Sequence, residues 1–117
     1  MIYTTYFARL RGMPSAVVPV AISNTLPKGV DMLHAPELAP PWEAVTDYKY
    51  TGDRNLFRER YYRALSLVDR SVFDALISSG PIALVCYEKD PQQCHRSLLG
   101  EWLKEHYNVE VAEWGCC

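Results

Sequence analysis

Hydrophobic and polar positions along the chain follow two periods, which predict strands in some segments and helices in others. Ile2 to Ala8 carries β-branched and aromatic residues and predicts a strand. Val17 to Ile22 is an apolar run typical of a strand buried on both faces. Pro19 cannot donate to a strand ladder, so we expect it at an edge or a bulge. Ile82 to Tyr87 and Val109 to Ala112 predict two further strands.

Three helices are predicted in the second half of the chain. Apolar residues at three- or four-residue steps predict one helix from Asn55, capped by Asp53 or Asn55, and a second after the N-cap Asp69. Gly80-Pro81 ends the second helix. A third helix is expected from Asp90 to about His106, with Asp90 as N-cap, Pro91 in the first helical position and Gln93 completing a capping box. The apolar positions of these helices are Phe57, Tyr61, Leu65, Val68, Val72, Phe73, Leu76, Ile77, Leu98, Leu99, Trp102 and Leu103.

Residues 23–50 contain several prolines and no long periodic stretch. We expect an ordered, irregular excursion there, with one short helical turn near Trp42 to Val45. Elsewhere, alternating strands and helices predict right-handed crossovers. The expected fold is therefore a single α/β domain over residues 1–117, with three layers and a mainly parallel sheet of about four or five strands with flanking helices. Ligands of such sheets bind beyond the carboxyl ends of the strands.

Composition and charge narrow the function classes. The 117 residues are 49% hydrophobic and 22% charged, and the formal net charge is −2, which argues against a strongly basic nucleic-acid binder. The longest apolar runs are far shorter than the roughly 20 residues that span a bilayer, and the first residues lack the pattern of a signal peptide. We therefore expect a cytoplasmic protein with no membrane partner. Its four cysteines are then expected to be free thiols, ligands or reactive groups rather than disulfides.

The segment from Cys86 to Arg96 is the densest candidate for chemistry, because it joins a strand end, a loop and a helix N-terminus. A helix N-terminus attracts anions and favours thiolates, and an arginine fork suits phosphate or carboxylate. The catalytic candidates are Cys86, Glu88, Cys94 and His95, and the ligand-binding candidates are Arg96, Lys89 and Tyr61.

Each candidate also has a purely structural interpretation. The cysteines are equally consistent with core packing, and the segment with a structural link between strand, loop and helix. A small zinc site from Cys86, Cys94 and His95, with Cys116 or Cys117, is a further alternative, although the spacing is not that of a common zinc module. A phosphatase or rhodanese loop needs arginine six residues after the cysteine, where Cys86 is followed by Gln92. No P-loop or dinucleotide motif is present, and we expect no cofactor.

Basic and aromatic residues interleave between Arg54 and Arg70. This pattern could hold a phosphate chain and stack a base. The alternative is an amphipathic helix with a basic outer face. The residues concerned are Arg54, Phe57, Arg58, Arg60, Tyr61, Tyr62, Arg63 and Arg70, with Lys49 and Tyr50 just upstream.

The motif Cys-x-Glu followed by Cys-His-Arg, after an apolar strand, resembles the signature of domain-of-unknown-function family 488. Its residues here are Cys86, Glu88, Cys94, His95 and Arg96; the opening Ile2 to Ala8 and Arg60-Tyr61-Tyr62 also look like the short branch of that family. The resemblance covers most of the chain and implies a small cytoplasmic α/β domain, without a settled activity. Longer members carry Asp-x-Arg after the second strand, where this chain has Val20-Ala21-Ile22-Ser23-Asn24.

These observations together favour an enzyme, or an enzyme-derived domain, that binds an anionic ligand. An anionic small molecule or a nucleic-acid phosphate is the expected partner. Arg96 and the helix N-terminus would hold the anion, Glu88 or His95 would move protons, and Cys86 or Cys94 would act as nucleophile or shape the pocket. The competing class is a non-catalytic interaction module in which the motif is structural.

Overall fold

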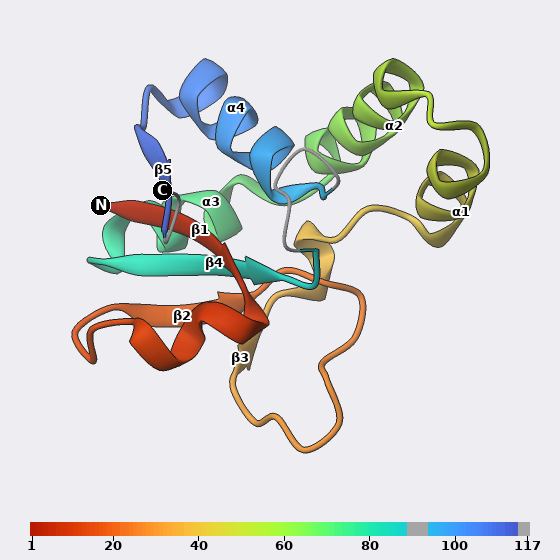
Figure 1. Ribbon diagram of the computed structural model, residues 1–117. Helices are drawn as coiled ribbons and strands as arrows, with labels where there is room; N and C mark the ends of the chain where they lie inside the picture. Colours follow the sequence, from red (N-terminus) through yellow and green to blue (C-terminus); the bar gives the residue numbers. More distant parts are fainter. Residues whose placement is uncertain (89–93, 115–117) are drawn as a thin grey trace.

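A five-stranded, all-parallel sheet forms the centre of the computed structural model, which describes residues 1–88 and 94–114. The strands lie in the order β3-β2-β4-β1-β5 (Figure 1). Their bounds are β1 (Ile2–Tyr6), β2 (Val18–Ala21), β3 (Leu33–His34), β4 (Ile82–Cys86) and β5 (Val111–Glu113). The expected α/β fold with a mainly parallel sheet is confirmed.

The central strand β4 pairs with β1 on one side and β2 on the other. All of its residues are buried, as expected for a parallel strand covered on both faces. Ile82, Leu84 and Cys86 pack into the larger core cluster, while Ala83 and Val85 pack into a smaller one. Cys86 is therefore the last residue of the central strand, at the carboxyl edge of the sheet.

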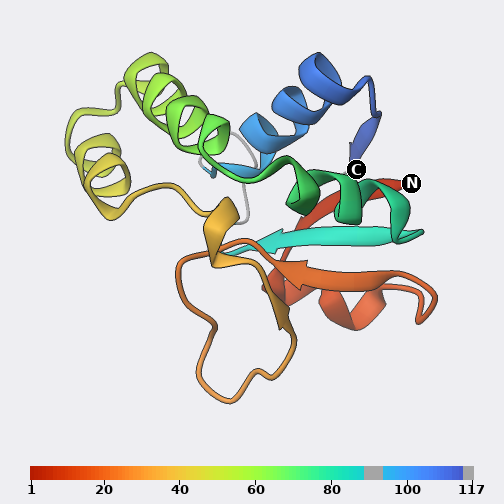
Figure 2. The same ribbon diagram turned by 180° about the vertical axis from the view of Figure 1, so that it is seen from behind.

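Four α-helices pack on the face of the sheet that Cys86 shares: α1 (Trp42–Thr51), α2 (Arg54–Ser66), α3 (Arg70–Ser78) and α4 (Arg96–Tyr107). Figures 1 and 2 show these helices on one side of the sheet and the 3₁₀ helix η1 (Phe7–Gly12) on the other. Asp53 caps α2 by accepting from Leu56 N, and Asp69 caps α3 by accepting from Ser71 N. The predicted N-caps of both helices are confirmed. For α2 the sequence allows Asp53 or Asn55, and the N-cap is Asp53.

Two apolar layers enclose the sheet and account for the three-layer architecture. The larger cluster joins the helices to Ile82, Leu84 and Cys86. The smaller cluster lies under η1 and unites Val17, Ala83 and Val85 with partly buried residues such as Phe7. No helix in the described parts of the chain combines the length and the apolar character needed to cross a bilayer.

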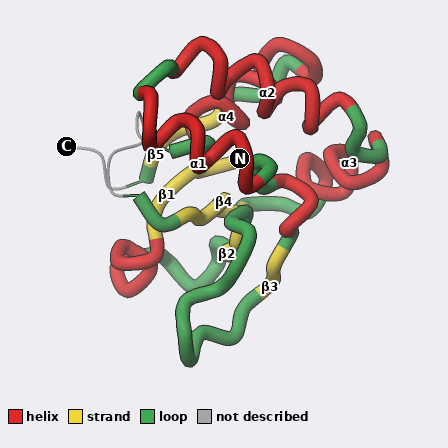
Figure 3. The backbone as a smooth tube through the Cα atoms, turned by 90° about the vertical axis from the view of Figure 1, so that its right-hand side faces the viewer, coloured by secondary structure: helices red, strands yellow, loops and turns green. Residues whose placement is uncertain are grey.

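Residues 23–50 are more regular than expected. They contain β3, the short 3₁₀ helix η2 (Pro36–Leu38) and all of α1 except its last residue, where only one helical turn is predicted from the sequence. The helix is easy to miss because it buries little: Ala44 is its buried residue, and it starts directly after Pro41. Figure 3 shows that the long loop between β2 and β3 extends away from the helices.

Two further expectations concern element ends. β3 pairs with Val20 and Ala21, so Pro19 lies before this pairing starts, where β2 faces β4 alone and an open edge tolerates proline. The described part of the last helix begins at Arg96, with His95 as N-cap, and Cys94 and His95 lie in a bend. The predicted helix start at Asp90-Pro91 and the Gln93 capping box fall outside the described residues.

Candidate functional site

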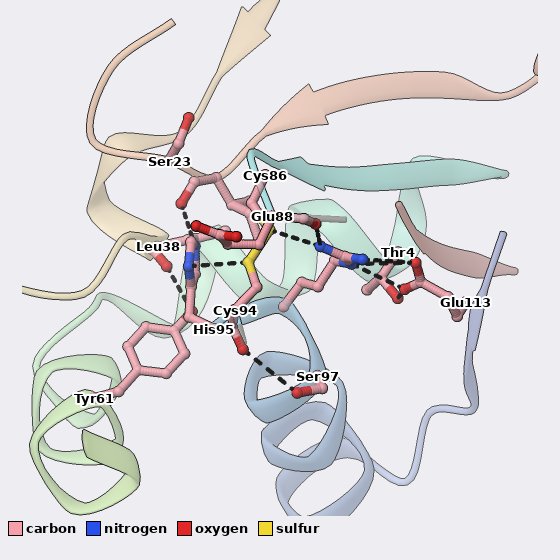
Figure 4. The surroundings of a disulfide bond; sticks show 12 residues. Thr4, Ser23, Leu38, Tyr61, Cys86, Glu88, Cys94, His95, Ser97 and Glu113 are labelled. Atoms are coloured by element: carbon pink, nitrogen blue, oxygen red, sulfur yellow. Dashed lines mark hydrogen bonds and ion pairs between the residues drawn. A yellow bond between two sulfur atoms is a disulfide. The ribbon is translucent and has the colours of Figure 1, made fainter. Parts of the chain in front are cut away.

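The site forms where the central strand ends and the last helix begins. Cys86 closes β4, and Cys94 lies two residues before α4. Their sulfurs are joined in a disulfide, so the expectation of free thiols, ligands or reactive groups rather than disulfides is wrong for this pair. Fold topology explains the pairing, because the carboxyl end of a parallel strand faces the start of the helix that follows it. Figure 4 shows His95 and Tyr61 on one side of the disulfide, and Glu113 and Thr4 on the other.

Arg96 is fully buried and holds the Cys86 side of the site. Its Nη1 donates to Cys86 Sγ over 3.2 Å and also to the carbonyl oxygen of Glu88. Its Nε and Nη2 donate to the Glu113 carboxylate at 3.0 and 2.9 Å, and Thr4 Oγ1 donates to the same carboxylate at 2.7 Å. The guanidinium lies over the Tyr6 ring at 5.7 Å. A cation is thus fixed beside the Cys86 sulfur.

This arrangement revises the expected role of Arg96. A guanidinium that is 0% exposed and already paired with a carboxylate does not meet an anion from solvent. Its Nη1 donates to the sulfur of Cys86 as well as to the carbonyl oxygen of Glu88, and a neighbouring cation stabilises a thiolate. Arg96 therefore contacts the Cys86 sulfur from a buried position and does not line the pocket.

His95 holds the Cys94 side of the site. Its Nε2 lies 2.7 Å from the carbonyl oxygen of Ile22, which can only accept, so Nε2 carries the proton. In the neutral ring, Nδ1 is then an acceptor, and it faces Cys94 Sγ at 3.6 Å. Burial lowers the pKa of His95 from 6.5 to about 4; the bond to Ile22 opposes this shift, while the charges of Arg96 and Arg54 add to it. The ring is therefore neutral at physiological pH and presents a lone pair to Cys94.

A pocket of about 590 Å³ opens on the disulfide. This volume suits a small organic ligand. Its walls come from the loop after β2, from α1, from the start of α2 and from the site itself. The lining residues are Ser23, Asn24, Thr25, Pro40, Trp42, Val45, Tyr48, Lys49, Gly52, Phe57, Cys86, Tyr87, Glu88, Cys94 and His95. All four predicted catalytic residues, Cys86, Glu88, Cys94 and His95, therefore line one pocket.

The remaining ligand-binding candidates are placed differently. Tyr61 is fully buried, its hydroxyl donates to the carbonyl oxygen of Leu38 at 2.6 Å, and its ring meets His95 edge-on at 5.4 Å between centroids. A ring so enclosed cannot stack on a ligand, so its expected role is corrected to packing behind His95. Lys89 lies outside the described residues.

Carboxylates of the same fold pair with four arginines of α2 and α3: Arg58, Arg60, Arg63 and Arg70. Arg54 instead donates to the carbonyl oxygen of Cys94 at 3.2 Å and to Ser97 Oγ at 2.7 Å. Arg58 faces Glu101 and Glu105 at 3.7 and 3.3 Å, and Arg60 pairs with Asp47. Of the interleaved aromatic residues, Phe57 and Tyr61 belong to the core. These contacts favour the amphipathic-helix interpretation of this segment over a surface that tracks a phosphate chain.

Three of the site's side chains could also hold a metal ion. The Cys86 and Cys94 sulfurs and a ring nitrogen of His95 lie within 4.8 Å of one another, and all three residues are buried. The bond from His95 Nε2 to the Ile22 carbonyl oxygen is the kind of contact that orients a histidine ligand. Such a site would need both thiols reduced. Cys116 and Cys117, the other proposed ligands, lie outside the described residues.

Sequence reasoning overlooks two partners of the site. Glu113 belongs to the edge strand β5, and its backbone neighbour in the sheet is Thr4 of β1, which hydrogen-bonds to it. A carboxylate at the carboxyl end of a strand, on the same edge as Cys86, is the signal that could have identified it. The second partner is the carbonyl oxygen of Ile22, whose residue type carries no signal for its contact with His95.

Residues 8–107 match the model of a protein family described as DUF488-N3a, the active DUF488-N3 subclade. No curated protein and no solved structure matches the chain. The match includes every residue of the pocket and the whole Cys86 to Arg96 segment.

Proposed function

The chain belongs to the DUF488 family, and from the geometry of its site we propose that it is an enzyme in which Cys86, once reduced, attacks a small anionic ligand bound in the pocket. The contact of 3.2 Å between Arg96 Nη1 and Cys86 Sγ carries this proposal. A thiolate is the reactive form of cysteine, and a fixed cation favours it. The description of the matched subclade as active agrees with an enzyme.

The surroundings of Cys86 support a chemical role over a packing role. A cysteine that only fills space needs no charged partner, whereas Cys86 Sγ accepts from a buried guanidinium whose orientation Glu113 and Thr4 fix. Cys86 also lines the pocket, so a ligand can reach the sulfur although 1% of the residue is exposed. Geometry of this kind is expected of an activated nucleophile.

The walls of the pocket indicate the kind of ligand. Tyr48 and Phe57 stack on each other at 4.7 Å, and Trp42, 58% exposed, adds a third ring. Lys49 supplies a positive charge to the lining, which supports an anionic ligand. We propose a ligand of nucleotide size, with a planar or apolar part against the rings and its anionic part at Lys49.

We propose that two residues of the site move protons. His95 Nδ1 is an acceptor at 3.6 Å from Cys94 Sγ. Glu88 lines the pocket and is exposed, so its carboxylate can reach a bound ligand and the solvent. In this proposal, His95 accepts the proton of the Cys94 thiol, and Glu88 exchanges a proton with the bound ligand.

Alkylation of the reduced protein tests this proposal against the non-catalytic module. The experiment uses the full chain with Cys116→Ser and Cys117→Ser, so that only the two site thiols count. At pH 6.5, where an ordinary thiol is about 1% ionised, iodoacetamide should modify Cys86 faster in the folded protein than in urea. The Cys86→Ser variant is the control that identifies the modified residue by mass. Reaction of both thiols only after unfolding would leave the motif with a structural role.

A metal centre is the second candidate function, because three donor atoms of Cys86, Cys94 and His95 lie within 4.8 Å. Three protein ligands and an open fourth position are typical of catalytic zinc sites. Protein purified under reducing conditions without chelators should then hold one zinc per chain, and Cys94→Ser should hold none. Elemental analysis that finds no stoichiometric metal removes this candidate and leaves the thiol chemistry as proposed.

A further inference from the structure

We infer that Cys86 and Cys94 form a dithiol–disulfide couple, in which Cys94 resolves a mixed disulfide that Cys86 forms with a small-molecule disulfide. This inference rests on the proposed function, because Cys86 remains the attacking thiol. It adds a catalytic role for Cys94 and names a substrate class for the same pocket.

The first support is the disulfide between the two residues. Cys86 is fixed at the end of the central strand. Cys94 lies two residues before α4, whose core residues anchor that helix to the sheet. The fold itself thus brings the two sulfurs within bonding reach, and both line one pocket. A resolving thiol needs this proximity, since it must attack the sulfur that already carries the substrate.

The second support is that each sulfur has a different polar partner. Cys86 Sγ faces the cationic Arg96 Nη1, which stabilises a thiolate before any substrate arrives. Cys94 Sγ faces His95 Nδ1, a neutral acceptor that takes a proton when Cys94 attacks. The two environments match an attacking thiol and a resolving thiol in that order.

The third support concerns the size of the substrate. Cys86 and Cys94 are 1% and 5% exposed, and they are reached through a pocket of about 590 Å³. A disulfide in a folded protein could not bring its sulfurs to that depth, whereas a low-molecular-weight disulfide fits. The substrate class is therefore a small organic disulfide, which in the proposed function carries its anionic group at Lys49.

The steps balance as follows for a disulfide RSSR. The Cys86 thiolate attacks one sulfur, the bond between the two substrate sulfurs breaks, and RS⁻ leaves with a proton from solvent. Cys94 gives its proton to His95 and attacks Cys86 Sγ, which expels the second RS⁻; that thiolate takes the proton from His95. The protein dithiol loses two electrons and one RSSR becomes two RSH. A thiol reductant returns Cys86 and Cys94 to the dithiol.

Trapping of the mixed disulfide tests the inference, with 2-hydroxyethyl disulfide as the probe and the same Cys116→Ser, Cys117→Ser background. One equivalent added to the reduced protein should release two thiols per chain and leave an internal disulfide without an adduct. Cys94→Ser should release one thiol and keep a stable adduct on Cys86. Ser66→Ala, a change at an exposed position of α2 outside the pocket lining, is the control and should release two thiols.

The outcomes separate the two proposals. If iodoacetamide modifies Cys86 as proposed but Cys94→Ser traps no adduct, the nucleophile stands and the redox couple is overturned. If wild type accumulates the mixed disulfide instead of the internal one, Cys94 does not resolve it and the couple is again overturned. If Cys86 reacts with neither reagent in the folded protein, both proposals fail. Circular dichroism of each variant establishes that it is folded before the assay.

Discussion

Arg96 Nη1 donates a hydrogen bond to Cys86 Sγ across 3.2 Å, although ten residues separate the two in the sequence. The shorter spacing of a familiar cysteine–arginine loop is absent here, and the fold reaches the same kind of contact by other means. β4 delivers the sulfur, and the first residue of α4 delivers the guanidinium. The opposite edge of the guanidinium is held by Glu113. The orientation of the cation is thus fixed by three elements.

The buried pair of Arg96 and Glu113 predicts a large cost for Glu113→Gln. The arginine is fully buried and the side chain of Glu113 is 17% exposed. Removing the carboxylate charge leaves an uncompensated buried cation, which destabilises a protein by about 3 kcal/mol. Urea denaturation should show this loss in the free energy of unfolding.

Thr4→Val compares the loss of one hydrogen bond to Glu113 with the loss of the Glu113 charge. Thr4 Oγ1 donates to Glu113 at 2.7 Å, so this variant loses one hydrogen bond and keeps the ion pair. We expect a loss of about 1 kcal/mol. Equal losses for Glu113→Gln and Thr4→Val would show that the charge of Glu113 contributes nothing beyond its hydrogen bonds.

His95 predicts that the protein is less stable at acidic pH. Burial lowers the pKa of His95 to about 4, against 6.5 in an exposed chain. Between these two values the unfolded state binds more protons than the native state, so the free energy of unfolding falls as the pH is lowered from 6.5 to 4. The full difference is on the order of 3 kcal/mol. Urea denaturation at a series of pH values measures the slope.

A neutral replacement isolates this contribution. His95→Gln removes the titrating ring, and its unfolding free energy should change less between pH 6.5 and 4 than that of wild type. An unchanged slope in His95→Gln would assign the acid sensitivity to other groups.

The strands and helices with strong periodic signals could be predicted from the sequence, because burial imposes the period. β1, β4, α2 and α3 are examples, and Asp53 and Asp69 were recognisable as caps by residue type. α1 was not predictable in full, since it buries Ala44 and otherwise offers partly buried side chains. A helix that packs through so narrow a contact leaves little periodicity in its sequence.

The candidate site likewise has residues that the sequence predicts and partners that it does not. Cys86, Glu88, Cys94 and His95 were identified because residue types that carry chemistry cluster between a strand and a helix. Their partners were not, because Glu113 and the Ile22 carbonyl oxygen reach the site through tertiary contacts. Residue type alone also failed to distinguish a guanidinium that meets a ligand from one that is enclosed.

The buried hydroxyl of Tyr61 predicts a structural effect without a binding effect. Tyr61→Phe removes the bond to the carbonyl oxygen of Leu38 and should cost about 1 kcal/mol in unfolding free energy. Ligand affinity should not change, because Tyr61 is absent from the pocket lining. Tyr48→Leu is the matched comparison within the lining. Calorimetry with a nucleoside monophosphate measures the affinity of each folded variant. Weaker binding by Tyr61→Phe than by Tyr48→Leu would contradict a purely structural role for Tyr61.

We expect the positive charge of Lys49 to strengthen the binding of an anionic ligand. It is the cation among the described residues that line the pocket. Lys49→Gln should weaken binding of an anionic probe such as a nucleoside monophosphate by about threefold, since a single exposed ionic contact contributes less than about 1 kcal/mol. The remaining affinity should depend less on salt, because the screened charge is gone.

Lys28→Gln controls for net charge, because Lys28 is exposed in the loop between β2 and β3 and does not line the pocket. Both variants change the charge of the protein equally, so a general electrostatic effect would weaken binding equally in the two. A local contact weakens it in Lys49→Gln alone. Fluorescence of Trp42, which lines the same pocket and is 58% exposed, offers a direct readout of occupancy, and Trp42→Phe identifies that signal. If Lys28→Gln and Lys49→Gln bind the probe alike, the anionic group of the ligand lies elsewhere than at Lys49.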